Sequence, residues 1–114
     1  MSQLPLLNEL VAQPQLREMV IQQTRKDLSV GEEELPDRSV MPDLVDFVND
    51  VSVCIRKRDG HSSSWLPSVL YRVDVPEKLV RQLDNGARYY DQLAELIVRR
   101  ELQKVLIRLH YKSS

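Results

Sequence analysis

The chain has 114 residues, 42% of them hydrophobic and 29% charged, which is typical of a folded globular protein rather than a disordered one. The net charge of −1 argues against a constitutively basic nucleic-acid-binding protein, and the single cysteine excludes an internal disulfide. No segment has the run of about 18 apolar residues that a membrane span needs. We therefore expect one soluble domain over residues 1–114, located in the cytoplasm.

Charge is distributed unevenly along the chain. Residues 1–50 carry four basic and ten acidic side chains, whereas residues 51–114 carry twelve basic and seven acidic ones. The two regions can attract each other, or each can attract a separate partner. The sequence leaves both possibilities open.

The first 41 residues indicate two helices and an acidic connector. A short helix is predicted over Leu4 to Ala12, and a longer one over Pro14 to Leu28, where apolar residues recur at spacings of three and four. Residues 29–41 include Gly31, Pro36 and three successive glutamates without periodicity, so they predict an acidic connector.

The clearest helix is predicted from Pro42 to Arg58. One apolar stripe recurs at helical spacing and consists of Leu44, Phe47, Val48, Val51 and Ile55. Aspartates lie toward its N-terminal end and three basic residues lie in its last turn, which suits the helix dipole. This helix therefore accounts for part of the uneven charge.

A second connector is predicted over residues 59–68, with Trp65 in a loop. The favoured interpretation is that Trp65 folds over the core, and the alternative is that it anchors a partner. In residues 69–75 apolar and polar side chains alternate, which predicts an extended segment. A short helix is then expected from Pro76 to Leu83, because proline suits a first helical turn.

The last segment, from Ala87 to His110, has two apolar stripes on different faces of a helix. We predict one long helix. The alternative is a strand over residues 105–111 that pairs in antiparallel fashion with residues 69–75. The sequence thus predicts a mostly α domain of about five helices with one extended segment, and an α+β domain is the alternative.

Short motifs for catalysis or for cofactor binding are missing from the sequence. Cys54 is predicted to be a buried thiol on the apolar stripe of its helix, and His61 and His110 are too few and too far apart in sequence for a metal site. We therefore predict no cofactor, no metal and no catalytic residues. A small enzyme without a recognisable motif remains one alternative.

The favoured function is a protein-interaction or assembly module that forms a homodimer. The second stripe of the last helix is predicted to face the partner, with two aromatic side chains as further anchors; the candidates are Val98, Leu102, Val105, Leu109, Trp65 and Tyr71.

A basic ridge of Arg100, Lys104 and Arg108 follows from their spacing of four residues on one helix. Like charges at this spacing repel, so the ridge predicts an acidic counterpart, such as the glutamates at 32–34 or the aspartates of the helix at 42–58. The alternatives are a solvated face and a contact with nucleic-acid phosphates.

Overall fold

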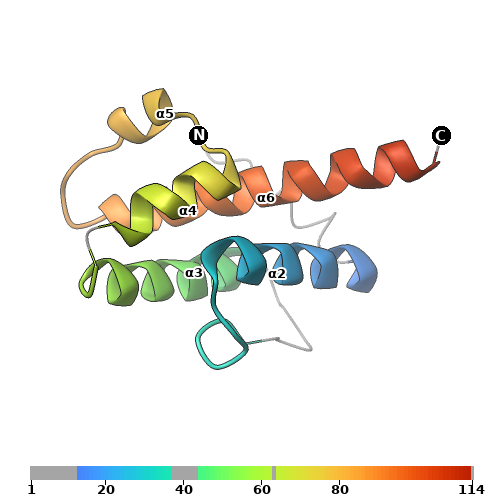
Figure 1. Ribbon diagram of the computed structural model, residues 1–114, viewed down its shortest axis with the longest axis horizontal. Helices are drawn as coiled ribbons and strands as arrows, with labels where there is room; N and C mark the ends of the chain where they lie inside the picture. Colours follow the sequence, from blue (N-terminus) through green and yellow to red (C-terminus); the bar gives the residue numbers. More distant parts are fainter. Residues whose placement is uncertain (1–12, 37–43, 63, 114) are drawn as a thin grey trace.

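The computed structural model describes residues 13–36, 44–62 and 64–113 (Figure 1). Within these residues the chain forms helices and no strand, which confirms the predicted mostly α fold. The predicted helix at Leu4 to Ala12 and the end of the acidic connector, residues 37–41, lie outside the described residues. The helices are α2 (Pro14–Leu28), α3 (Leu44–Asp59), α4 (Trp65–Val73), α5 (Glu77–Arg81) and α6 (Tyr89–Ser113).

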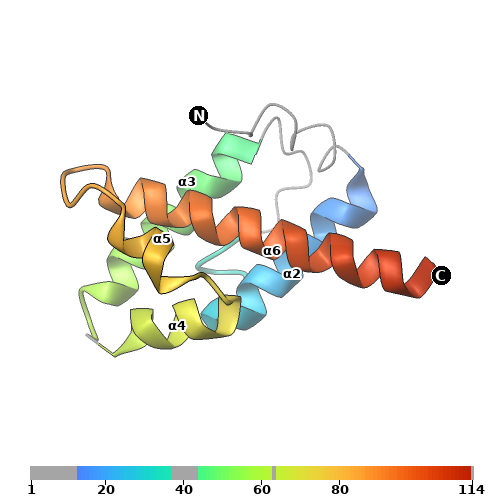
Figure 2. The same cartoon turned by 90° about the horizontal axis from the view of Figure 1, so that it is seen from above.

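Helix α6 organises the packing. It crosses over α2 and α3 and also contacts α4, as the two views in Figures 1 and 2 show. Helix α4 contacts α2 and α3 as well, so these four helices enclose one core. Helix α5 lies outside this core, near α4 and the first half of α6 (Figure 2), and contributes no fully buried side chain.

The core is built from the apolar stripes that the sequence predicts. Phe47, Val51 and Ile55 of α3 are buried, and Val20 and Ile21 of α2 are buried too. Both apolar stripes of α6 are buried because the helix has neighbours on more than one side. Its fully buried side chains include Leu93, Ala94, Ile97, Val98, Leu102 and Val105.

The ends of α2 follow ordinary local rules. Pro14 occupies the first turn, where its missing N–H is not needed. Ser29 takes the left-handed conformation (φ 58°), and its N–H donates to the carbonyl oxygen of Lys26, while the N–H of Val30 donates to that of Arg25. These contacts satisfy carbonyl groups in the last turn and direct the chain into the acidic connector.

The prediction of an extended segment over residues 69–75 is wrong, because most of it is the C-terminal part of α4. Val69 and Val73 are four residues apart and Leu66 precedes Val69 by three, so the alternating pattern also fits a helical stripe. All three are buried. The helix ends at Val73, and the next residue, Asp74, takes the left-handed conformation (φ 70°) and donates its N–H to the carbonyl oxygen of Leu70.

The predicted long last helix is confirmed, because α6 continues without interruption to Ser113. The alternative pairing of residues 69–75 with residues 105–111 is therefore contradicted. The connector predicted over residues 59–68 is also too long, since α4 begins at Trp65.

Within the described ranges, none of the helices is both long and apolar enough to cross a membrane.

Candidate functional site

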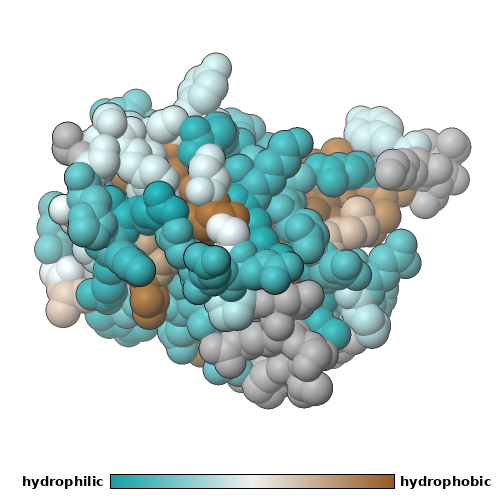
Figure 3. All heavy atoms as spheres, turned by 60° about the horizontal axis from the view of Figure 1, so that its bottom comes forward, coloured by the Kyte–Doolittle hydropathy of each residue, from teal (hydrophilic) through white to brown (hydrophobic). Residues whose placement is uncertain are grey.

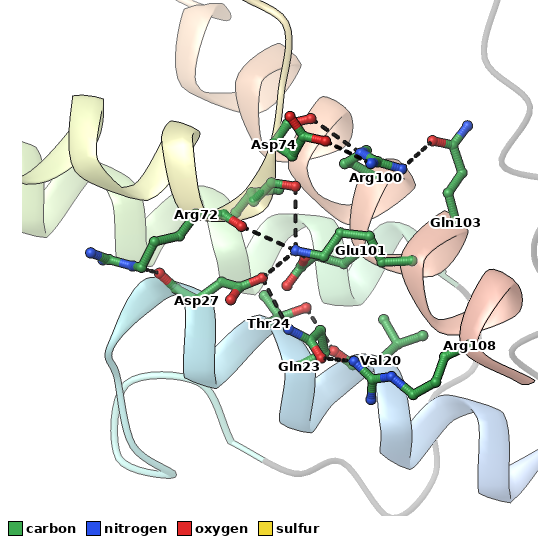
Figure 4. Close-up of polar contacts among 12 residues, drawn as sticks. Val20, Gln23, Thr24, Asp27, Arg72, Asp74, Arg100, Glu101, Gln103 and Arg108 are labelled. Atoms are coloured by element: carbon green, nitrogen blue, oxygen red, sulfur yellow. Dashed lines mark hydrogen bonds and ion pairs between the residues drawn. The ribbon is translucent and has the colours of Figure 1, made fainter.

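The basic ridge of α6 contacts acidic and polar groups of its own chain (Figure 4). The ammonium group of Lys104 lies 2.6 Å from Oδ2 of Asp27 on α2 and 2.8 Å from Oε1 of Glu101 on its own helix. It also donates to the carbonyl oxygens of Arg72 and Val73 at the end of α4. Lys104 therefore joins three helices.

The other two ridge residues are engaged as well. Arg100 Nη2 lies 2.8 Å from Oδ2 of Asp74, and its Nε donates to the carbonyl oxygen of the same residue. Arg108 donates to the side-chain oxygen of Gln23 on α2. An acidic counterpart was expected, but it comes from Asp27 and Asp74 rather than from the glutamates at 32–34. These contacts leave the nucleic-acid alternative without specific support.

Glu101 is the most perturbed carboxyl group of this cluster. Its side chain has 0% exposure, and burial, followed by the neighbouring carboxyl group of Asp27, raises its pKa to about 8. Burial alone would raise the pKa of Asp27, but the neighbouring Glu101 carboxyl group and the hydrogen bonds from Lys104 and Gln23 outweigh burial and lower this pKa. At neutral pH the arrangement is a protonated Glu101 beside an ionised Asp27, with Lys104 as the counter-charge.

A second ion pair holds the acidic connector. Glu34 makes a two-point contact with the guanidinium of Arg58 on α3, with 2.7 Å from Nε to Oε2. The adjacent Leu35 is buried, and its carbonyl oxygen accepts a hydrogen bond from Arg25 Nε. One of the three glutamates thus has a structural partner, whereas Glu32 and Glu33 are exposed.

The apolar stripe predicted as a dimer face lies inside the single chain. Val98, Leu102 and Val105 are buried in the core that α6 shares with α2, α3 and α4, and Leu109 is half-buried against it. The sequence correctly indicated two apolar faces on this helix. It could not tell that neighbouring helices of the same chain cover both, so the three buried residues offer no surface to a partner.

Cys54 is buried in the core as a free thiol. Burial, and secondarily the negative charge of Glu34, raise its pKa to about 11. A thiol in this state is a poor nucleophile at neutral pH. Among the described residues, no three His, Cys, Asp or Glu side chains are grouped as metal ligands would be.

The two aromatic candidates behave differently. Trp65 begins α4, not a loop, and is half-buried against the core. Tyr71, six residues later on the same helix, is 88% exposed. The exposure of Tyr71 is unusual for a large aromatic side chain, and Tyr71 lines a groove together with residues of α5.

A groove lies on this face, between α4 and α5, and we call it the α4–α5 groove. It has a volume of about 740 Å³, which is within the range of ligand-binding cavities. Its walls are mainly apolar and are formed by Pro67, Leu70, Tyr71, Val75 and Val80. The charged residues that line it are Asp74, Glu77 and Arg81.

Sequence reasoning identified Tyr71 but missed the rest of this groove and the buried acids. One signal was available for Glu101, which lies between Val98 and Leu102 within an apolar stripe and is therefore placed toward the core. The sequence gives no comparable indication that Leu70 and Val80 line one groove. They belong to two different helices, and the turn from Asp74 to Pro76 brings these helices together.

The face shown in Figure 3, turned from Figure 1 so that its bottom comes forward, is mainly hydrophilic, with apolar side chains exposed in separate areas.

Comparison of the sequence and fold with protein-family models, curated proteins and solved structures gave no match. A functional assignment therefore depends on the geometry of the chain itself.

Proposed function

We propose that this chain is a non-catalytic protein-interaction module and that the α4–α5 groove is its binding surface. The observation that carries the proposal is the position of Tyr71. Its ring is 88% exposed and forms part of the wall of an apolar cavity of about 740 Å³. Water contact with such a ring and cavity is unfavourable, and tyrosine beside an apolar pocket is typical of binding hot spots.

The surroundings of the groove support this proposal. Helix α5 has no buried side chain, and its Val80, which lines the groove, is only partly buried against the core. A bound partner would cover the apolar surface of α5 that the core leaves exposed. As part of the proposal, we take the cytoplasm as the location, since a lone reduced thiol such as Cys54 is ordinary there.

A catalytic role receives less support from the same geometry. The groups with strongly raised pKa values are Cys54 and Glu101, and both are buried away from solvent. A general acid or a nucleophile must reach its substrate, so neither residue suits catalysis in this arrangement.

Selection from a displayed library of random peptides tests the proposal. We expect peptides rich in aromatic and aliphatic residues to bind the native chain, and to bind Tyr71→Ala at least about tenfold more weakly. The matched control is Tyr111→Ala, which changes another exposed tyrosine on α6. Peptides that bind both variants equally well, or a selection that yields no binder, would contradict the proposal.

A further inference from the structure

The charged residues that line the α4–α5 groove leave no large net charge on it. Asp74 is paired with Arg100, so its charge is compensated inside the chain. The remaining charged residues of the lining are Glu77 in the first turn of α5 and Arg81 at its end, four residues apart. The groove thus has an acid at one end of the short helix and a base at the other.

Such a surface is complementary to itself. When two copies face each other across a two-fold axis perpendicular to α5, their α5 helices run in opposite directions, and Glu77 of each copy comes opposite Arg81 of the other. A strongly acidic or strongly basic partner would gain attraction at one end and repulsion at the other. The charge pattern therefore favours a second copy over a highly charged partner.

The shape of the surface agrees with this pattern. Each copy presents a protruding side chain, Tyr71, and an apolar cavity beside it, and a two-fold axis brings the protrusion of each copy to the cavity of the other. A cavity of about 740 Å³ has room for an aromatic ring together with its neighbours.

We propose that the α4–α5 groove is occupied by the same groove of a second copy of this chain, in a two-fold dimer with reciprocal Glu77–Arg81 ion pairs. This inference rests on the proposed function, since it names the partner of that groove. The homodimer expected from the sequence is retained, but its contact face moves from the second stripe of α6 to α4 and α5.

Sedimentation equilibrium on charge-reversal variants tests the dimer. The native chain should self-associate between about 1 µM and 1 mM, and Glu77→Arg and Arg81→Glu should each weaken self-association by about tenfold, because like charges then face each other. An equimolar mixture of the two variants should associate about as well as the native chain, since each pair is again opposite in charge. Lys78→Glu, a charge reversal on α5 outside the groove lining, should associate like the native chain.

Several outcomes would overturn the dimer. A native chain that stays monomeric throughout the range, or variants that associate as strongly as the native chain, exclude this contact. If a charge-reversal variant does not fold, Glu77→Gln and Arg81→Gln provide the same comparison with a smaller expected loss. A third outcome is a chain that stays monomeric but binds selected peptides, with weaker binding in Tyr71→Ala. That outcome would exclude a second copy as the partner but would still support the proposed protein-interaction function.

Discussion

The ammonium group of Lys104 lies 2.6 Å from the Asp27 carboxylate, although 77 residues separate them in the sequence. The same group contacts Glu101 and the carbonyl oxygens at the end of α4 (Figure 4). One cation therefore links α2, α4 and α6 at a half-buried position. Apolar packing is non-directional, so these contacts add a geometric constraint on how the three helices meet.

Removing this cation should destabilise the fold strongly. Lys104→Met keeps the aliphatic stem but leaves the ionised carboxylate of Asp27 without its counter-charge, so we expect a loss of about 3 kcal/mol in the free energy of unfolding. Lys78→Met, at an exposed position on α5, should change it by less than about 0.5 kcal/mol. Urea denaturation of both variants measures the difference, and equal losses would contradict a structural role for Lys104.

The buried carboxyl group of Glu101 should make stability depend on pH. Its pKa is raised from 4.5 to about 8 in the folded chain, so unfolding releases a proton between these values. The free energy of unfolding should therefore fall as the pH rises through this window, by at most about 1.4 kcal/mol per pH unit. The pKa of Asp27 is lowered from 3.8, so its contribution to the free energy of unfolding changes only below about pH 4 and does not oppose this trend.

Glu101→Gln isolates this contribution, because the amide stays neutral throughout the window. We expect its stability to vary less with pH than that of the native chain, and the two curves to diverge as the pH rises from about 5 to 8. Glu95→Gln is the matched control on α6, where the glutamate is half-exposed and paired with Arg99. Parallel curves for the native chain and Glu101→Gln would show that Glu101 ionises normally.

Much of the helical fold could be predicted from the sequence, because long stripes at helical spacing are specific. The ranges predicted for α2, α3 and α6 agree closely with those observed. The error at residues 69–75 arose because seven residues are too few to separate an alternation of two from a spacing of four. Contacts between segments that are distant in the sequence decide which helix covers each face of α6. The pattern of apolar residues along one helix does not predict these contacts.

Leu102 provides a test of whether the second stripe of α6 is core. Its side chain is 1% exposed, so Leu102→Ala should leave a cavity and lower the free energy of unfolding by about 3 kcal/mol. The loss should be independent of protein concentration, because the covering side chains belong to the same chain. Ile107→Ala, at a position that is 51% exposed, should cost less than about 1 kcal/mol. A loss that appears only at low protein concentration would instead indicate a subunit contact.

Cys54 should react slowly with alkylating reagents. The thiol is buried and its pKa is raised to about 11, so little thiolate is present at neutral pH and the reagent has no direct access. We expect labelling by iodoacetamide to be at least about a hundredfold slower in the folded chain than in denaturant. Mass spectrometry at timed intervals measures both rates, and equal rates would mean that α3 opens easily around this residue.

The contact between Glu34 and Arg58 should fasten the acidic connector to α3. Arg58 lowers the pKa of Glu34 below 4.5, so this contact stabilises the folded chain above that pH and is lost as the pH falls through the lowered value. Because both side chains are partly exposed, we expect Glu34→Gln to cost no more than about 1 kcal/mol. Glu33→Gln, at the exposed neighbouring position, should cost nothing measurable. Hydrogen exchange of residues 30–35 would show the same contrast, with faster exchange only in Glu34→Gln, and equal exchange in both variants would contradict it.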